Sequence, residues 1–205
     1  MRTVELFAGT QSFSDVMRKH KHDTFTIDNT PGLAPLPPDL LIDIREVSGR
    51  SKPLKQIDLL WASPPCQGFS VAVIGRNWNY DKTPKTASAK LAMELVLHTL
   101  GIIKTAKPKY WFIENPRGML RKMPFMEGFI RHTVSYCQYG DTRQKPTDIW
   151  TNAEWWHPKP ICERGAPCHV GAPRGSRTGT QGIKGAKDRG KIPAALFEEI
   201  LAQMP

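Results

Sequence analysis

The sequence predicts an α/β fold in which a mostly parallel β-sheet is flanked by helices. Short apolar runs alternate with segments of helical periodicity through the first two thirds of the chain, as in strands joined by crossover helices. Several of these runs end abruptly in glycine, proline or an acidic residue, as strands do where they leave a sheet. No run of about 18 or more apolar residues occurs, so we expect no membrane span and a cytoplasmic protein.

Five apolar runs have the length and composition of strands, and helical segments separate them. Phe13, Val16 and Met17 recur with helical spacing after the first run. A longer helix is expected over about 88–105, beyond a polar loop over about 71–86. Because parallel strands end at one edge of a sheet, we expect ligands to bind at their carboxyl ends. The five predicted strands are 4–7, 24–27, 40–42, 57–61 and 110–113.

The composition changes after Trp150. Residues 151–191 hold eight Lys or Arg, three acidic residues and seven of the 16 glycines, with little periodicity. Ile192-Pro193 then opens a closing helix, with the proline near its first turn. We therefore expect a core over 1–150, a small basic glycine-rich segment over 151–191 and a C-terminal helix over 192–205 that packs back on the core.

The charge balance favours a polyanionic partner. Lys and Arg number 29 against 19 acidic residues, which gives a formal net charge of +10. Such a surplus suits nucleic acid, although a basic surface can also serve solubility alone. The four cysteines show no disulfide framework, so free, functional or metal-bound thiols are expected.

Pro64-Pro65-Cys66-Gln67 follows the predicted strand at 57–61 directly. Two prolines remove backbone donors and fix the path of the chain, which holds Cys66 at the carboxyl end of that strand. A thiol there can act as a nucleophile if its pKa is lowered. The alternative is a small buried structural cysteine.

Other strand ends carry residues suited to a binding site. Gly9 lies where the first strand turns, a position at which a backbone can approach a cofactor closely. Asp28 ends the second strand, where a carboxylate can accept hydrogen bonds from ribose hydroxyls, and Asp43 ends the third. Either aspartate can instead be a turn residue. Glu114 follows the fifth strand, where burial would raise its pKa.

With these motifs in this order, the chain resembles the DNA cytosine-5 methyltransferase family over most of its length. The resemblance implies a Rossmann-like S-adenosylmethionine-dependent methyltransferase fold, with 1–150 as the catalytic core. The motifs similar to those of the family are Phe7-Ala8-Gly9 (cofactor), Pro64-Pro65-Cys66-Gln67-Gly68-Phe69-Ser70 (catalysis), Glu114-Asn115, Tyr139-Gly140 with Arg143 and Lys145 (the Gln-x-Arg-x-Arg segment), and Ile192-Pro193 with Leu196 (closing helix).

The resemblance also implies a reaction and a role for each site residue. Cys66 would add to C6 of a cytosine flipped out of double-stranded DNA, and Glu114 would bind the ring at N3 and at the exocyclic amine. S-adenosylmethionine would supply the methyl group. The expected catalytic residues are Cys66, Glu114, Arg143 and Lys145. The expected cofactor residues are Phe7, Gly9, Asp28, Asp43 and Pro65. The expected substrate-binding residues are Gln67, Ser70, Arg76, Asn115, Arg174 and Arg177.

The chain departs from the family pattern in three ways. Gln11 and Ser12 stand where further glycines are usual, and Thr147 stands at the second arginine position of the Gln-x-Arg-x-Arg segment. The large target-recognition domain is reduced to about 40 residues over 151–191. This resembles the reduced methyltransferases of bacterial viruses, so we expect a monomer acting in restriction-modification in a bacterial or bacteriophage-infected cell.

Other readings of the sequence stay open. An RNA cytosine-5 methyltransferase would use the same Cys66 and Glu114, and a non-catalytic nucleic-acid-binding relative would keep the fold without turnover. A zinc site formed by His157, Cys162, Cys168 and His169 is conceivable, but the Cys-x5-Cys-His spacing lacks the usual short clip, so no metal is expected.

Overall fold

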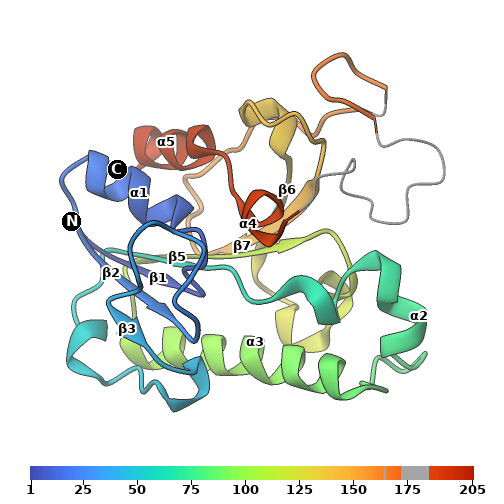
Figure 1. Ribbon diagram of the computed structural model, residues 1–205, viewed down its shortest axis with the longest axis horizontal. Coiled ribbons are helices and arrows are strands. Elements are labelled where there is room, and N and C mark those ends of the chain that lie inside the picture. The colour runs from blue at the N-terminus through green and yellow to red at the C-terminus, as the bar shows by residue number, and fades with distance from the viewer. Residues whose placement is uncertain (164, 172–184) are drawn as a thin grey trace.

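A computed structural model describes residues 1–163, 165–171 and 185–205. Its seven-stranded sheet has the order β3-β2-β1-β4-β5-β7-β6 (Figure 1). In the described chain only β7 runs antiparallel, and it pairs with β5 on one side and β6 on the other. The predicted α/β fold with a mostly parallel sheet is confirmed. The strands are β1 (Arg2–Leu6), β2 (Asp23–Asp28), β3 (Leu40–Leu41), β4 (Leu59–Ala62), β5 (Tyr110–Pro116), β6 (Ile130–Ser135) and β7 (Pro146–Thr151).

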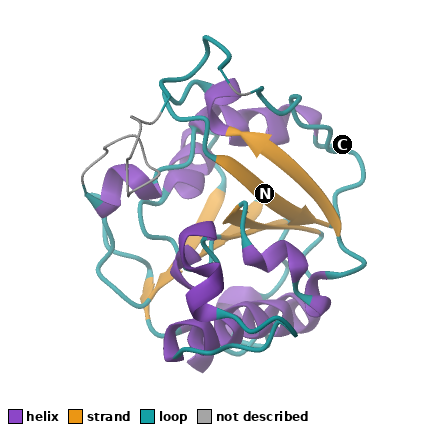
Figure 2. Ribbon diagram, turned by 90° about the vertical axis from the view of Figure 1, so that its right-hand side faces the viewer, coloured by secondary structure: helices purple, strands orange, loops and turns teal. Residues whose placement is uncertain are grey.

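Helices cover both faces of the sheet, as the two views in Figures 1 and 2 show. The long helix α3 (Ala87–Ala106) lies along one face, and α1 (Ser12–Lys19) and α5 (Ala194–Gln203) lie together on the other. No helix in the described ranges is long and apolar enough to cross a membrane. The shorter helices are α2 (Ile74–Asn77), α4 (Ala186–Gly190), and the 3-10 turns η1 (Ile44–Glu46), η2 (Lys52–Leu54), η3 (Cys66–Gly68), η4 (Val71–Val73), η5 (Met119–Lys122), η6 (Pro124–Met126) and η7 (Tyr136–Tyr139).

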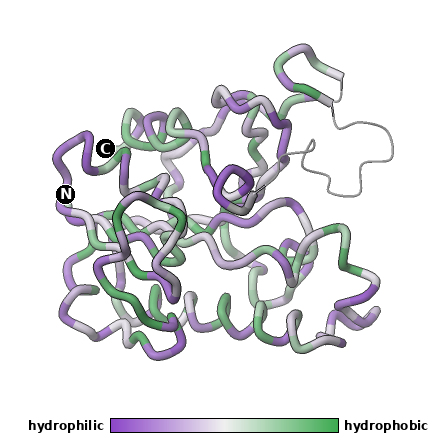
Figure 3. The backbone as a smooth tube through the Cα atoms, in the orientation of Figure 1, coloured by the Kyte–Doolittle hydropathy of each residue, from purple (hydrophilic) through white to green (hydrophobic). Residues whose placement is uncertain are grey.

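The central strands supply side chains to two hydrophobic clusters because successive residues of a strand point to opposite faces. In β4, Leu60 and Ala62 join the cluster on the α3 side, whereas Leu59 and Trp61 join the cluster under α1 and α5. Phe197 of α5 packs edge-on against Trp61, with ring centroids 4.8 Å apart. In contrast to α5, the short helix α4 is mostly hydrophilic, as its colour in Figure 3 shows. The closing helix thus contacts the sheet, while the domain boundaries at 150 and 191 remain predictions.

The sequence pattern located α3 to within a residue or two because its ends carry local signals. Thr86 caps its first turn, with Oγ1 accepting a hydrogen bond from the Ala89 amide at 3.2 Å. Lys107 ends it in the left-handed conformation, with φ 51°.

Two strands were not predicted, and their composition explains why. β6 is partly exposed and contains Arg131 and His132. β7 begins with Pro146 and has Asp148 at its centre, a residue type depleted in strands. Asp148 is fully buried, and it is tolerated there because Arg121 forms an ion pair with it.

Candidate active site

The carboxyl ends of β1, β4 and β5 meet at one edge of the sheet. The register pairs Leu6 with Ala62 and Ala62 with Ile113. The residues that follow these positions therefore lie next to one another, which brings the Cys66 loop beside Glu114.

The loop that carries Cys66 is held from three sides. A Cβ atom at Gly68 would clash with the Cβ of Ala92, so only glycine lets η3 pack this closely on α3. The Gly68 carbonyl accepts hydrogen bonds from Trp78 Nε1 at 2.8 Å and Asn77 Nδ2 at 3.2 Å. On the β5 side, Asn115 Nδ2 donates to the Pro64 carbonyl at 2.9 Å. The backbone around Cys66 is therefore fixed before any substrate arrives.

Cys66 is half-buried, and its surroundings hold it as a thiol. Burial raises the pKa of Cys66, and the nearby Glu114 carboxylate raises it further. The positive charges of Lys145 and Arg189 act in the opposite direction. For Cys66 to act as a nucleophile it would have to lose this proton, and the two cations favour that loss.

Glu114 is buried and lacks an ion-pair partner at hydrogen-bonding distance within the described chain. Burial raises its pKa, while Lys145 and hydrogen bonds from Tyr136 and Ser63 lower it. The Tyr136 hydroxyl donates to Glu114 Oε1 at 2.9 Å. A carboxyl group with a raised pKa, oriented by a tyrosine, can donate a proton or a hydrogen bond to a ring nitrogen.

Lys145 is the cation that couples electrostatically to both Cys66 and Glu114. Its Nζ lies 4.7 Å from the centroid of the Tyr136 ring and donates to the Arg189 carbonyl at 3.2 Å. Burial lowers the pKa of Lys145, and Glu114 raises it. The predicted catalytic residues Cys66, Glu114 and Lys145 are thus brought together.

Arg143, the fourth predicted catalytic residue, has other partners in this structure. Its guanidinium is paired with Asp141 and donates to the backbone carbonyls of Arg189 and Lys191 at 3.2 and 3.3 Å. Asp141 accordingly raises the pKa of Arg143. These contacts favour a positioning role, in which Arg143 joins the loop before β7 to the C-terminal end of α4.

Four of the five predicted cofactor residues line one pocket. It lies where β1, β2 and β4 end, and Phe7, Asp28, Asp43 and Pro65 contribute to its wall together with apolar residues of β2, η1 and α3. Asp43 also caps η1 and is paired with Arg45, which lowers the pKa of Asp43 to about 2. The carboxylate is therefore charged at neutral pH.

Gly9, the fifth cofactor residue, is tied to the same pocket through Asp28. Its amide donates to Asp28 Oδ2 at 2.9 Å, while the amide and hydroxyl of Thr30 each donate to Oδ1 at 2.9 Å. A carboxylate offers about four acceptor sites, and the described residues use three of those of Asp28, which leaves about one for a ligand.

Gln11, one of the departures from the family pattern, has a structural explanation. It adopts the left-handed conformation (φ 53°) that glycine favours, and its side chain is buried. Nε2 donates to the Leu36 carbonyl at 2.8 Å, and Oε1 accepts from Arg18 at 2.7 Å. The side chain therefore joins the 31–38 loop to α1, which a glycine could not do.

The predicted substrate-binding residues are dispersed around the Cys66 loop. Gln67 and Arg76 are exposed, and Ser70 is half-buried and bridges to Gly118. Asn115 is fully buried and braces Pro64, while its Oδ1 has no hydrogen-bond partner among the described residues. Arg174 and Arg177 lie outside the described residues.

Sequence reasoning missed Tyr136 and Ser63, the hydrogen-bond partners of Glu114. Tyr136 follows β6, which was not recognised as a strand, so no spacing rule directed attention to it. Ser63 precedes the Pro-Pro-Cys motif, and its position between a strand and that motif was a usable signal.

Comparison with known proteins supports the family resemblance. The family profile of C-5 cytosine-specific DNA methylases matches residues 1–124. A Frog virus 3 (isolate Goorha) protein described as a probable DNA (cytosine-5)-methyltransferase is 30% identical over 223 residues, covering 98% of this chain and 99% of the viral protein.

The chain also aligns with solved structures of methyltransferases. A DNA modification methyltransferase encoded in an Escherichia coli prophage aligns with a TM-score of 0.52 at 15% identity, over 84% of this chain. The alignment spans 57% of the prophage protein. The Dnmt2 methyltransferase of S. pombe aligns with a TM-score of 0.46 at 19% identity, over 74% of this chain and 50% of the yeast protein. The prophage likeness shows that the chain has a methyltransferase fold.

Proposed function

The chain belongs to the C-5 cytosine-specific DNA methylase family, and on that premise we propose that it methylates C5 of cytosine in DNA through a covalent bond between Cys66 and C6 of the ring. One observation carries this proposal. A half-buried thiol, a buried carboxyl group without an ion-pair partner among the described residues, and a half-buried lysine meet at the carboxyl edge of the sheet. Covalent addition to the cytosine ring needs a nucleophile, and a nearby acid and cation can assist it by stabilising the charges that develop.

Each of the three groups has a distinct task in the proposed reaction. Cys66 loses its proton, aided by the Lys145 charge, and its sulfur bonds to C6 of cytosine. Glu114, held by Tyr136, donates a hydrogen bond or proton to N3, which stabilises the negative charge that the addition moves into the ring. C5 then takes the methyl group from the sulfonium. The C5 proton passes to solvent water, and the electron pair of that C–H bond expels the Cys66 thiolate. Glu114 regains any proton that it gave to N3, which releases 5-methylcytosine.

The groups that Phe7, Asp28, Asp43 and Pro65 present around this pocket suit the parts of S-adenosylmethionine, so we assign the cofactor to this edge of the sheet. When bound, this cofactor supplies an electrophilic methyl group on a sulfonium. The free acceptor site of Asp28 suits a ribose hydroxyl, and the charged Asp43 suits the exocyclic amine of adenine. Pro65 lies in this wall one residue before Cys66, so the cofactor and the nucleophile share one loop.

Duplex DNA would supply the cytosine by base flipping. Cys66 is half-buried and Glu114 is buried at the edge of the sheet, so a base that stays stacked in the duplex cannot contact them. Flipping costs a few kcal/mol of unstacking, which contacts with the phosphates would offset. We assign those contacts to the loop around Arg76 and to the basic segment 151–191, a reduced target-recognition region.

A mechanism-based substrate tests the proposal. The wild-type chain should transfer tritiated methyl groups from S-adenosylmethionine to duplex DNA, and DNA with 5-fluorocytosine should remain covalently attached, because fluorine at C5 blocks the elimination step. Cys66→Ala should form no adduct while S-adenosylmethionine binding, measured by calorimetry, is retained. An adduct in Cys66→Ala, or transfer to structured RNA without transfer to DNA, would overturn the proposal.

A further inference from the structure

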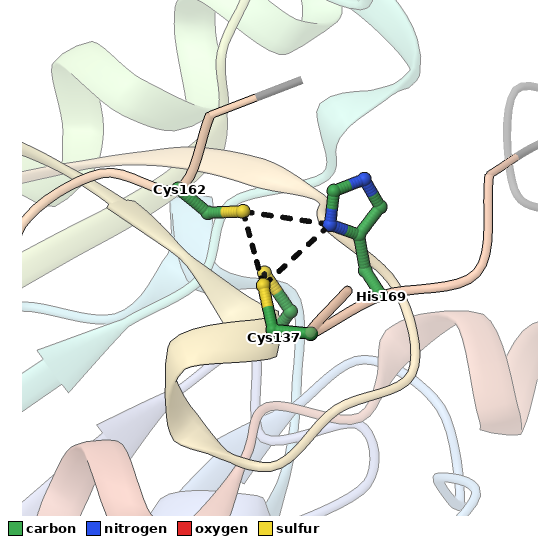
Figure 4. A group of neighbouring side chains, drawn as sticks. Cys137, Cys162 and His169 are labelled. Carbon is green, nitrogen blue, oxygen red and sulfur yellow. Dashed lines mark hydrogen bonds between the residues drawn. The ribbon is translucent and has the colours of Figure 1, made fainter. Parts of the chain in front are cut away.

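Four side chains that can bind a soft metal meet at the end of β6. Cys137 lies in η7, Cys162 follows the loop after β7, and Cys168 and His169 follow a few residues later. Three sulfur atoms and one imidazole nitrogen all lie within 4.8 Å of one another. Figure 4 shows the side chains of Cys137, Cys162 and His169 converging on one point.

The distances within this cluster are those of a tetrahedral metal shell. The Sγ atom of Cys168 lies 3.2 Å from that of Cys162 and 3.6 Å from that of Cys137. His169 Nδ1 lies 3.4 Å from Cys162 Sγ and 3.7 Å from Cys168 Sγ. With zinc–sulfur bonds of about 2.3 Å, tetrahedral geometry separates neighbouring sulfur ligands by about 3.7 Å. A single ion at the centre would thus need only small shifts of the four atoms.

We propose that Cys137, Cys162, Cys168 and His169 form a structural zinc site. Three thiolates and one imidazole are a common zinc donor set, and four protein ligands leave no position open for catalysis. The site differs from the set considered from sequence because Cys137 replaces His157 and comes from a separate segment. The expectation that no metal binds rested on the Cys-x5-Cys-His spacing, which contains only three of the four ligands.

The segment that carries three of the ligands needs such a cross-link. Ile161 and Val170, its largest apolar side chains, are 46% and 63% exposed, so apolar burial does little to hold it. Hydrogen bonds attach it to other segments of the described chain, among them those from the Cys162 amide to Ser135 Oγ, from Gln144 Nε2 to the Cys162 carbonyl, and from the Val170 amide to the Thr142 carbonyl. Where a core is this small, a metal supplies the missing stability.

A second layer of contacts fits the same interpretation. Gln138 Nε2 points to Cys168 Sγ at 3.9 Å, an N–H to sulfur contact of the kind that orients metal-bound thiolates. Cys137 and Cys162 are each 7% exposed, which shields the cluster from solvent on one side.

The zinc site would join the basic segment to the catalytic edge. Tyr136, the partner of Glu114, directly precedes Cys137. His169 lies just before residues 172–184, which contain Arg174 and Arg177. The ion would therefore hold the described part of 151–191 against the strand end that orients Glu114. This last step rests on the proposed function, whereas the metal site itself does not.

Metal analysis of the full chain tests the site directly. Protein purified with reductant and without chelator should contain one zinc per chain by elemental mass spectrometry, and exchange for Co²⁺ should give thiolate charge-transfer and tetrahedral d–d bands. Cys162→Ser and Cys168→Ser should lose the zinc or weaken its binding at least tenfold. His157→Ala, a neighbouring histidine outside the cluster, and Cys66→Ser should each keep one zinc.

Two results would overturn the proposal. One is a wild-type chain that stays metal-free after incubation with zinc under reducing conditions. The other is a reductant-sensitive disulfide between Cys162 and Cys168 in a protein without metal. Cys66→Ser that binds zinc but fails to methylate would leave the zinc site intact and bear only on the nucleophile, so the two proposals fail separately.

Discussion

At the scale of single residues, the site depends on groups whose protonation the surrounding protein controls. Burial raises the pKa of both Glu114 and Cys66, and Lys145 opposes both shifts. Cys66 is therefore held as a thiol at neutral pH, and burial shifts Glu114 towards its protonated form. Lys145 therefore favours the thiolate form of Cys66 against the effect of burial.

Replacing Glu114 with Gln should lower turnover much more than it weakens DNA binding. The amide keeps the shape but donates from a neutral group that cannot give up a proton as charge develops on the ring, so we expect a loss of roughly 10²- to 10⁴-fold in turnover. Single-turnover methyl transfer and DNA titrations measure the two quantities. Weaker DNA affinity with unchanged turnover would make Glu114 a structural acid.

Replacing Lys145 with Met should raise the pKa of Cys66 further, because a positive charge beside the thiol is removed. Thiolate formation then requires a higher pH. At neutral pH the alkylation of Cys66 by iodoacetamide, followed by peptide mass spectrometry, should slow roughly 3- to 10-fold. Lys109→Met removes an exposed lysine that lies over Tyr110 and serves as the control. Equal alkylation rates in the two variants would mean that the charge of Lys145 does not influence the Cys66 thiol.

At the scale of elements, the catalytic loop depends on how closely η3 approaches α3, and α1 depends on a buried acid beneath its first turn. Gly68 lies against Ala92 without room for a side chain. Glu5 is buried at the end of β1, and its Oε2 accepts a hydrogen bond from the Ser14 amide at 2.9 Å. Both contacts can be tested separately from catalysis.

Gly68→Ala should lower stability by about 1–3 kcal/mol and reduce methyl transfer, because η3 must move away from α3 to relieve the clash. Gly101 lies within α3 with open space where a Cβ would be placed. Gly101→Ala should therefore raise stability by about 0.5–1 kcal/mol through its higher helix propensity. Thermal melts of both variants check the pair, and equal effects would contradict the close packing at Gly68.

Glu5 should make stability fall as the pH rises. Burial raises its pKa from 4.5 to about 7 in the folded chain, so the folded state holds this proton more tightly than the unfolded state. The stabilisation is complete below the unfolded value and is lost as pH rises through the folded value, on the order of 3 kcal/mol in all.

Urea melts at about pH 5 and about pH 8 should show that Glu5→Gln removes much of this pH dependence, while the exposed Glu46→Gln leaves it unchanged. If Glu5→Gln kept the pH dependence of the wild-type free energy of unfolding, that dependence would belong to other titratable groups.

At the scale of the whole molecule, the basic surplus is concentrated in a short region. Residues 151–191 carry eight Lys or Arg and three acidic residues, half of the +10 net charge of the chain. A segment this short buries little surface, so we expect recognition of a site of only a few base pairs.

Arg174→Ala and Arg177→Ala test that expectation. An arginine that reads guanine should relax specificity at one position of the target, at a cost of about 1–3 kcal/mol, whereas a phosphate contact should weaken binding to all sequences alike. Bisulfite sequencing of methylated DNA and salt-dependent binding distinguish the two cases. Unchanged affinity and methylation pattern in both variants would remove these arginines from recognition.

The sequence by itself determined the parallel core and the strand ends at which Cys66 and Glu114, two of the four proposed catalytic residues, lie. Apolar runs followed by glycine, proline or an acid mark strand ends, and the carboxyl ends of parallel strands converge whatever the intervening chain does. Cys66, Glu114 and the pocket residues Phe7, Asp28 and Asp43 could therefore be assigned from local pattern. The sequence also showed that Gln11 stands where the family usually has glycine, but the contacts that explain it appear only in the structure.

Only the tertiary structure decided what surrounds those groups. Tyr136 and Lys145 reach Glu114 because β7 inserts antiparallel between β5 and β6, a pairing that residue spacing does not encode. Cys137 meets Cys162 and Cys168 for the same reason, since the end of β6 and the loop after β7 lie side by side although they are distant in sequence. Local periodicity reports burial within an element, whereas contacts between elements follow from packing that involves the whole chain.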